Sequence, residues 1–417
     1  MLAATRRVLA HPSPTSSSPT SAPLYRSLVT RLLPATQNDP PQAARELRWM
    51  VETLLSRRHN PAHRFLRPHN NNNNNNTASS PSSPPSSLAS AAATAAALPT
   101  LTPTELARLS SWISRRVDTH TPLQYLLATQ SFCNLDLRVR RPTLIPRWET
   151  EEWTMRLASI LLQQQTKTPP PLQRPQQQQR PPQRPPPRRP ARRRFLRILD
   201  LCTGTGCIGL ALANAIPHAH VTAGDIHPRA VALARINARR NGLEDRVTAQ
   251  WVDVFDDGVM RHLVHQNSDN NNNDGGDDDG TNDAAAAAGG KFFDLVVANP
   301  PYISPRDLAT LDPDVRLWED VAALVADDDG TEFHARIAAC AKDVLLRPKP
   351  PPPPSPTVAG AADDDDDDDD THHHPRLVME IGEGQGERVK AIVQRQGFSD
   401  VVVWKDLAGV DRCVVGY

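Results

Sequence analysis

From Leu196 onward the chain repeats one pattern, in which a short apolar run is followed by a turn and an amphipathic helix. The runs that we expect to form strands are 196–201, 220–226, 247–254, 295–298, 377–381, 401–404 and 413–415. The helices expected between them are 208–216, 228–241, 331–346 and 386–396. Such alternation predicts a mainly parallel sheet that is covered by helices on both faces. Because no helix separates the last two strands, we expect them to form an antiparallel hairpin at one edge.

Two segments before this region have the periodicity of amphipathic helices. Residues 41–57 place their apolar side chains on one face of such a helix. Residues 102–117 do the same, with Thr102 or Thr104 as the capping residue. We therefore expect a small helical domain over 39–120.

The next segment, 121–165, changes period. The apolar residues of 135–139 alternate with charged ones, as they do in a half-buried strand. Pro142 interrupts this strand, and residues 144–145 are expected to begin a second short one. The segment is therefore predicted to be a β-hairpin linker that leads into a helix over 149–162.

Four stretches interrupt these units, and each is too poor in large apolar side chains to offset the entropy cost of ordering the chain. They are rich in Asn, Ser, Pro, Gln, Arg or Asp, and they span 70–90, 166–194, 267–290 and 348–374. We expect each of them to be a disordered insert. The remaining residues form the helical domain, the linker and one α/β domain over 195–417.

The amino-terminal residues 1–38 have the composition of a mitochondrial transit peptide, with four arginines, many Ser and Thr, and no acidic residue. No run of about 20 apolar residues is present, so we expect no membrane span. None of the five cysteines forms a Cys-x-x-Cys pair, which argues against a zinc site or a disulfide framework. The formal net charge is zero, so composition does not indicate a nucleic-acid partner. We expect a protein of the mitochondrial matrix without a metal site.

A glycine turn follows the first strand of the alternating region. Gly204 and Gly206 allow a tight turn and a close approach of a ligand to the backbone. Asp225 ends the second strand, where it can accept hydrogen bonds from ribose hydroxyls, and Asp253 ends the third, where it can meet an adenine amino group. Each feature alone has a plainer interpretation as a packing turn, a helix cap or a surface acid. Together they favour a cofactor that contains a nucleoside.

The tetrad Asn299-Pro300-Pro301-Tyr302 directly follows the fourth strand. The side-chain oxygen of Asn299 and the backbone carbonyl of Pro300 can each accept a hydrogen bond from a planar NH2 group. The prolines stiffen the backbone, and the ring of Tyr302 can stack on a planar amide. This arrangement favours a methyltransferase that acts on an NH2 nitrogen over a proline-rich turn without function.

Four blocks of the sequence resemble the HemK-type release-factor glutamine methyltransferases. The blocks are 121–127 with Phe132 and 144–151, then 200–206, then 299–303, and a tail formed by 314–316, 323–324, 380–382, 385–387 and 411–412. The tetrad alone is shared with adenine-N6 DNA and RNA methyltransferases, whereas the Leu-Ile-Pro-Arg run at 144–147 is more specific to the HemK type.

The resemblance implies a seven-stranded, Rossmann-like class I methyltransferase domain, preceded by a helical substrate-binding domain and a hairpin linker. It implies S-adenosyl-L-methionine as cofactor, and as partner a class I peptide chain release factor whose Gly-Gly-Gln glutamine is methylated. By resemblance, the residues that hold the cofactor are Asp200, Cys202, Thr203, Gly204, Thr205, Gly206, Asp225, Asp253, Val254 and Asn299. Those that hold glutamine are Asn299, Pro300, Pro301 and Tyr302, with Asn299, Pro300 and Tyr302 as the catalytic residues. We expect a monomer.

The sequence departs from the family pattern at a few positions. Cys202 stands where the family usually has glycine, Trp148 replaces a usual proline, and residues 316–320 lack the usual Glu-Pro step. Two other functions remain open. A nucleic-acid adenine methyltransferase would use the same tetrad but would need a basic surface and a pocket for an extruded base. A non-catalytic adaptor that retains the fold would not need the intact tetrad.

Overall fold

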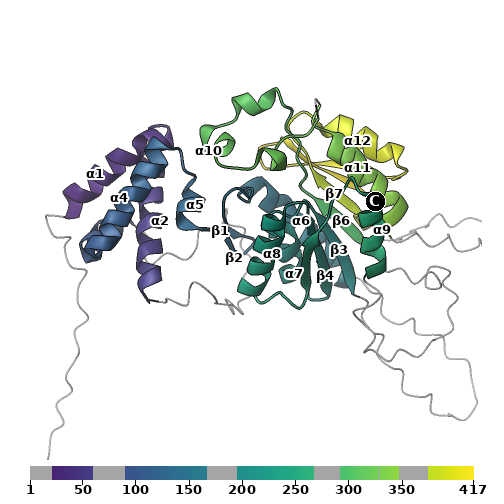
Figure 1. The fold of residues 1–417 in the computed structure, drawn as a ribbon, viewed down its shortest axis with the longest axis horizontal. Coiled ribbons are helices and arrows are strands. Elements are labelled where there is room, and N and C mark those ends of the chain that lie inside the picture. Colours follow the sequence, from purple (N-terminus) through teal and green to yellow (C-terminus); the bar gives the residue numbers. More distant parts are fainter. Residues whose placement is uncertain (1–20, 60–89, 167–194, 267–291, 328, 347–373) are drawn as a thin grey trace, which may run out of the picture. The chain divides into compact units, whose positions relative to one another are not determined.

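The computed structural model describes residues 21–59, 90–166, 195–266, 292–327, 329–346 and 374–417 (Figure 1). These residues form two compact units, the first ending at Leu127 and the second beginning at Ala128. The four predicted inserts lie outside the described residues, apart from their end residues Ser90, Thr166 and His374. Among the described residues, no helix is both long enough and apolar enough to span a membrane.

The second unit contains the predicted seven-stranded sheet, in the order β5-β4-β3-β6-β7-β9-β8. Its strands are β3 (Leu196–Leu201), β4 (Ala219–Asp225), β5 (Val247–Trp251), β6 (Leu295–Ala298), β7 (Leu377–Glu380), β8 (Val401–Lys405) and β9 (Asp411–Gly416). Strands β3 to β7 pair in parallel, and β9 is antiparallel to both of its neighbours. The edge hairpin that the sequence predicted is therefore present. The strand order reverses between β3 and β6, which is where α/β sheets bind ligands.

Helices cover both faces of this sheet (Figure 1). One face packs against α6 (Trp148–Thr166), α7 (Cys207–Ala215) and α8 (Pro228–Arg240). The other packs against α9 (Asp257–Gln266), α11 (Glu332–Cys340) and α12 (Gly386–Arg395). Ile198 belongs to the first core and Leu199 to the second, as the two-residue period of a strand requires. The predicted helix 331–346 is α11 followed by a π-helical segment, Ala341–Leu345, and the sequence did not predict α9 or the short α10 (Pro313–Arg316).

The hairpin before this sheet differs from the prediction. Strand β1 (Thr129–Phe132) pairs with β2 (Leu135–Arg138) across the turn at Cys133 and Asn134, both of which have positive φ. The predicted strand at 135–139 is therefore β2, and it pairs with β1 before it in sequence and not with residues 144–145 after it. Residues 144–145 form no strand, since they continue through an irregular segment into α6.

The first unit is the predicted helical domain, and its core is formed by apolar faces of its longer helices. Its helices are α1 (Ser21–Leu32), η1 (Leu33–Thr36), α2 (Pro40–His59), α3 (Ala91–Ala97), η3 (Leu98–Thr100), α4 (Pro103–Asp118) and α5 (Leu123–Leu127). Thr102 caps α4 in a capping box: its hydroxyl accepts from the Glu105 N–H, and the Glu105 carboxylate accepts from the Thr102 N–H. The sequence allowed Thr102 or Thr104 in this role.

The helical unit begins earlier than the sequence analysis placed it. Residues 21–32 were included in the transit-like segment 1–38, but they form α1. Leu28 and Leu32 lie one turn apart on this helix and are buried in the same core as Leu47. Composition alone could not reveal this, because a helix with one apolar face and arginines on the other has the composition of a transit peptide.

A buried ion pair joins α4 to α2. Arg116 donates to both oxygens of Glu46, at 3.0 and 3.2 Å, and to the backbone carbonyl of Ala35 at 3.2 Å. The two side chains are only 8% and 5% exposed. Removal of either partner would leave the other charge buried without its counter-ion.

We expect Arg116→Leu to lower the free energy of unfolding by about 3 kcal/mol, because Glu46 would remain buried and unpaired. Urea denaturation of the full chain, followed by circular dichroism, measures this change. The matched control is Arg115→Leu at the exposed neighbouring position, for which we expect a change within about 0.5 kcal/mol. Equal effects of the two substitutions would contradict the structural role of the pair.

Candidate active site

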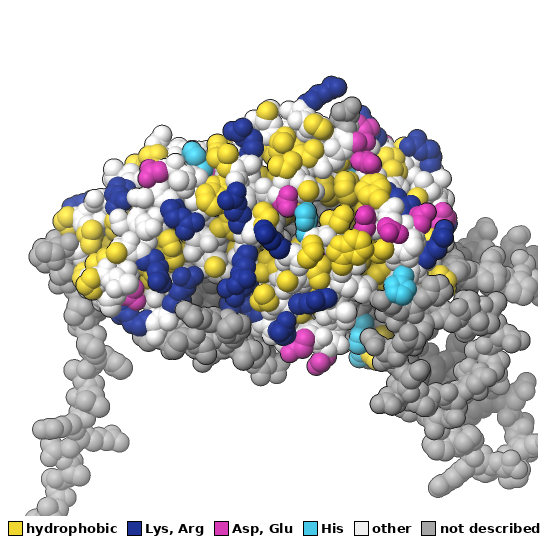
Figure 2. Space-filling view, viewed as in Figure 1, with side chains coloured by type: hydrophobic (Ala, Val, Ile, Leu, Met, Phe, Trp, Pro, Cys, Tyr) yellow, Lys and Arg dark blue, Asp and Glu magenta, His cyan; other side chains and the backbone are white. Residues whose placement is uncertain are grey.

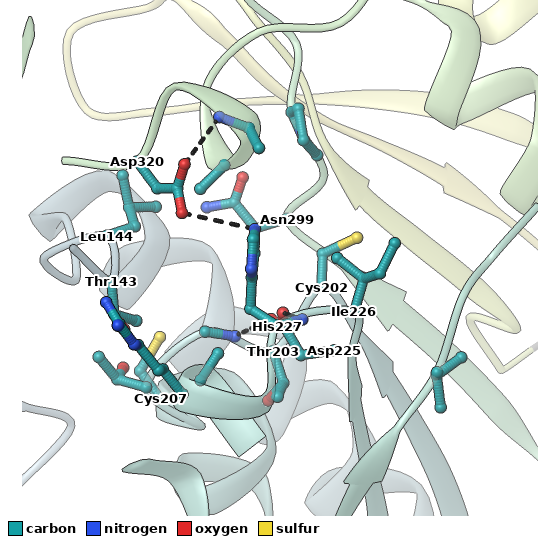
Figure 3. A pocket seen from close by; sticks show the side chains of 18 of the residues that line it. Thr143, Leu144, Cys202, Thr203, Cys207, Asp225, Ile226, His227, Asn299 and Asp320 are labelled. Carbon is teal, nitrogen blue, oxygen red and sulfur yellow. Dashed lines mark hydrogen bonds and ion pairs between the residues drawn. The ribbon is translucent and has the colours of Figure 1, made fainter. Parts of the chain in front are cut away.

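A cavity of about 620 Å³ opens at the carboxyl ends of β3, β4, β5 and β6 (Figure 3). Each of these strands is followed by residues that line it. The lining residues include 202–205, 225–230, 252–255, Asn299 and Pro301. A second wall comes from the linker, with 142–144, 146–147 and Thr150.

Most residues that the sequence assigned to cofactor or substrate lie at this cavity, although they come from four strands. The predicted residues that line it are Cys202, Thr203, Gly204, Thr205, Asp225, Asp253, Val254, Asn299 and Pro301. Those that do not line it are Asp200, Gly206, Pro300 and Tyr302.

Asp200 lies behind the glycine turn and is fully buried. Its Oδ2 accepts hydrogen bonds from the Thr203 hydroxyl at 2.6 Å and from the Gly209 N–H at 3.0 Å. These bonds connect the end of β3 to the turn and to the first residues of α7. Burial raises the pKa of Asp200 to about 7, and the bonds from Thr203 and Gly209 oppose that rise. The carboxylate therefore holds the turn in shape from the side away from the cavity.

Asp225 occupies the cavity side of the same turn. Its Oδ2 accepts from the Gly204 N–H at 2.8 Å, and its Oδ1 accepts from the His227 N–H at 2.9 Å. Each carboxylate oxygen can accept a further bond, and Figure 3 shows Asp225 at the opening beside Thr203 and His227. Burial raises the pKa of Asp225 despite the two bonds. The residue can therefore receive two neighbouring hydroxyls of a ligand.

Cys202 adopts a conformation that favours glycine. Its φ is 57°, in the left-handed region. Burial and the nearby carboxylates of Asp225 and Asp200 raise the pKa of the thiol well above its usual value. Cys202 thus contributes a neutral thiol to the cavity wall, and the departure from the family glycine is accommodated at a cost in backbone strain.

The tetrad is fixed by residues behind it. The Asn299 amide lies 3.4 Å from the Thr150 hydroxyl, and the Tyr302 hydroxyl lies 3.4 Å from Glu380. Gln385 donates to the backbone carbonyl of Tyr302 at 2.9 Å. Asn299 and Pro301 therefore face the cavity, while the Tyr302 hydroxyl points to a buried carboxylate.

A strap, residues 304–326, leaves the tetrad and returns to it. Ile303 bonds to both Leu324 and Ala326 through its backbone, which joins the two ends of the strap. Asp320 lines the cavity, and its Oδ2 lies 3.4 Å from Nε2 of His227. Figure 3 shows this contact between Asp320 and His227 at the opening.

The linker holds the strap in place. The Asp320 N–H donates to the Pro142 carbonyl at 2.8 Å, and Arg147 pairs with Glu319 at 2.6 Å. Burial raises the pKa of Glu319, and Arg147 opposes that rise. The cavity-lining linker residues within 144–151 were part of the family resemblance, whereas Pro142 and Thr143 were not, and none of them was predicted to have a role in the site.

Apolar side chains complete the cavity and its rim. Phe255 and Phe333 meet edge to face with ring centroids 5.1 Å apart, and both line the cavity. Ile226 lines it as well and is 50% exposed, while Val321 of the strap is 47% exposed. Figure 2 shows apolar side chains exposed among charged ones on one face of the molecule. The described residues contain no group of three or more His, Cys, Asp or Glu suited to hold a metal ion.

Similarities to known proteins include one family and two relatives. Residues 190–264 match the methyltransferase small domain family. The chain is 30% identical over 316 residues to the release factor glutamine methyltransferase of Geobacter sulfurreducens, a match that covers 76% of this chain and 80% of that protein. It is 31% identical over 232 residues to a Schizosaccharomyces pombe protein named probable MRF1 mitochondrial N(5)-glutamine methyltransferase mtq1, covering 54% and 58% of the two chains.

One similar solved structure is the hMettl16 catalytic domain in complex with a MAT2A 3'UTR hairpin. It has a TM-score of 0.39 and 12% identity, and the match covers 75% of this chain and 81% of that one.

The backbone of the glycine turn, residues 202–206, predicts opposite effects for two substitutions. Cys202→Gly removes the left-handed strain, which outweighs the added freedom of the unfolded chain, so we expect a gain of about 0.5 kcal/mol in the free energy of unfolding. Gly206→Ala should lose about 2 kcal/mol, because φ is 84° and the new Cβ would lie 3.2 Å from Cβ of Ala234. Urea denaturation of both variants tests this, and a loss of stability in Cys202→Gly would refute the strain at residue 202.

Proposed function

Because this chain belongs to the family of release factor glutamine methyltransferases, we propose that it methylates the mitochondrial peptide chain release factor. The methyl group of S-adenosyl-L-methionine would pass to the side-chain nitrogen of the glutamine in the Gly-Gly-Gln motif. The family consists of S-adenosylmethionine-dependent enzymes, and this chain has the seven-stranded sheet of a class I methyltransferase. The release factor as substrate and the mitochondrial location are the parts that we propose.

The observation that carries this proposal is the meeting of two groups of residues at one cavity. The glycine turn and Asp225 lie on one side, and Asn299 and Pro301 lie on another. A bound cofactor and a substrate amide would therefore lie against each other. The cavity of about 620 Å³ is within the range of about 300–1,000 Å³ typical of small-molecule sites.

The residues present fit the cofactor by their chemistry. We assign the ribose to Asp225, whose two oxygens each keep a free acceptor position. The adenine would lie between apolar walls that include Ile226 and Phe255, beside Asp253. The methionine part would lie against the turn that begins at Cys202. Asp200 and Gly206 would act indirectly, by shaping this turn. When bound, the cofactor supplies the electrophilic methyl group.

An amide nitrogen is a poor nucleophile because its lone pair is delocalised, so the chain must contribute mainly by positioning. We assign one acceptor for the NH2 group to Oδ1 of Asn299 and the other to the carbonyl of Pro300. These two bonds would aim the nitrogen along the line of displacement. The nitrogen becomes acidic as the new bond forms and releases one proton to solvent, so no strong base is required at the start.

Three observations support a mitochondrial protein substrate. Val321 of the strap, next to the cavity-lining Asp320, is exposed and suits contact with a protein surface. The Schizosaccharomyces pombe relative is named a mitochondrial glutamine methyltransferase. Residues 1–38 have a transit-like composition, and the packing of α1 would place any cleavage before Ser21. We assign recognition of the release factor to the helical unit and expect the enzyme to act as a monomer.

Transfer of labelled methyl from S-adenosylmethionine tests the reaction and the substrate together. We expect label on purified mitochondrial release factor and none on a version whose Gly-Gly-Gln glutamine is changed to alanine. Label that entered RNA or DNA instead would indicate an adenine methyltransferase. A chain that bound the cofactor but labelled neither protein nor nucleic acid would indicate an adaptor.

The role of Asn299 predicts a selective loss of turnover. Asn299→Ala should lower kcat by about 100-fold or more, since one of two acceptors that aim the nitrogen is removed. Cofactor affinity, measured by calorimetry, should change far less. The control is Asn214→Ala on the exposed surface of α7, which should retain normal turnover. Near-normal kcat in Asn299→Ala would rule out this mechanism.

A further inference from the structure

A buried carboxylate lies behind the tetrad. Glu380, at the end of β7, is 2% exposed. Its Oε2 accepts two hydrogen bonds from α6, one from the Thr150 hydroxyl at 2.7 Å and one from the Trp153 indole N–H at 2.8 Å. Its Oε1 lies 3.4 Å from the Tyr302 hydroxyl. The carboxylate thus connects α6, β7 and the tetrad at one point.

The bond to Glu380 decides what Thr150 can offer to the active site. A hydroxyl has one proton and can otherwise only accept. Since Thr150 donates that proton to Glu380, it presents only lone pairs to Asn299, which lies 3.4 Å away. The nearest group of Asn299 must therefore be its NH2 group. The opposite end of the same amide, Oδ1, is left free as an acceptor.

We propose that Glu380 and Thr150 are positioning residues that fix the orientation of the Asn299 amide and so make the site selective for a carboxamide over a carboxylate. With Oδ1 free, Asn299 can accept from the NH2 group of glutamine. If the amide were reversed, its NH2 group would donate instead, and a glutamate side chain would be the better partner. This inference rests on the proposed function, because it specifies how glutamine is recognised.

The orientation is insensitive to the charge of Glu380. Burial raises the pKa of this carboxyl, and the bonds from Trp153 and Thr150 oppose the rise. Because the Trp153 indole N–H can only donate, and the carbonyl oxygen of a carboxylic acid is a better acceptor than its hydroxyl oxygen, any proton bound by Glu380 would lie on Oε1, toward Tyr302. Thr150 therefore donates to Oε2 in either state. A glutamine at position 380 would place its oxygen at the Oε2 position for the same reason.

Thr150→Val tests the relay, because it keeps the shape of the side chain and removes its hydroxyl. We expect kcat on the release factor to fall about tenfold, the effect of one lost hydrogen bond at the reacting group, with cofactor affinity unchanged. Thr150→Ser and Glu380→Gln, which keep a hydrogen bond between the two side chains, should each retain most of the wild-type kcat. The matched control is Thr154→Val. Thr154 is equally buried one turn later on α6, but its hydroxyl donates to the Thr150 carbonyl.

The preference for glutamine over glutamate distinguishes a change in the orientation of the Asn299 amide from a general loss of protein stability. The measurement is inhibition of release-factor methylation by the Gly-Gly-Gln variant that has glutamate in place of glutamine. The preference for glutamine is the ratio of the inhibition constant of this variant to the KM of the release factor. We expect Thr150→Val to reduce the preference for glutamine about tenfold, and Thr154→Val to leave it unchanged. An unchanged preference in Thr150→Val, or an equal loss in both variants, would overturn the inference.

A third measurement does not depend on the identity of the substrate. Exchange of the Asn299 side-chain NH2 protons with solvent can be followed by NMR on protein labelled at asparagine, with Asn299→Ser used to assign the signal. We expect slow exchange in the wild type and in Thr150→Ser, and faster exchange in Thr150→Val. Equal rates in all three would contradict the relay, whereas absence of label on the release factor would contradict only the proposed function.

Discussion

The parallel pairing of β3 with β6 places Leu201 opposite Ala298, so the chain leaves the sheet at Cys202 and at Asn299 from the same edge. The glycine turn and the tetrad are far apart in sequence, yet this register makes them neighbours. The strand order reverses at this pair, because β4 and β5 lie on the β3 side and β7 lies on the β6 side. The cavity therefore results from main-chain pairing, and its side chains take positions that the sheet has already set.

The linker supplies what the sheet does not. Six of its residues between Pro142 and Thr150 line a second wall of the cavity. Pro142 and Arg147 also bind the strap, at Asp320 and Glu319 respectively. The helix that follows is part of the core against the same sheet. A segment that precedes the α/β domain in sequence is thus part of the wall of its cavity.

Two buried carboxylates, Asp200 and Glu380, lie behind the residues that line the cavity, and each orients groups that face it. Asp200 holds the glycine turn through Thr203 and Gly209. Glu380 receives two donors from α6. Burial raises the pKa of both groups, which shows that their charged forms are costly in these places. Their hydrogen bonds offset part of that cost and give the polar groups at the site a defined direction.

The sequence by itself determined the features that depend on neighbouring residues. The alternation after Leu196 predicted the sheet, and the turn at 202–206 and the tetrad indicated the two parts of the candidate site. The apolar periodicity of 102–117 predicted α4, although it left the cap open between Thr102 and Thr104. Only the tertiary structure decided that Asp200 turns away from the cavity and that Thr150 reaches Asn299. It also decided that residues 144–145 form no strand, with Leu144 lining the cavity, and that α1 belongs to the helical core. The physical reason is that periodicity, capping and turns are local, whereas the surface against which a side chain is buried is chosen by long-range pairing.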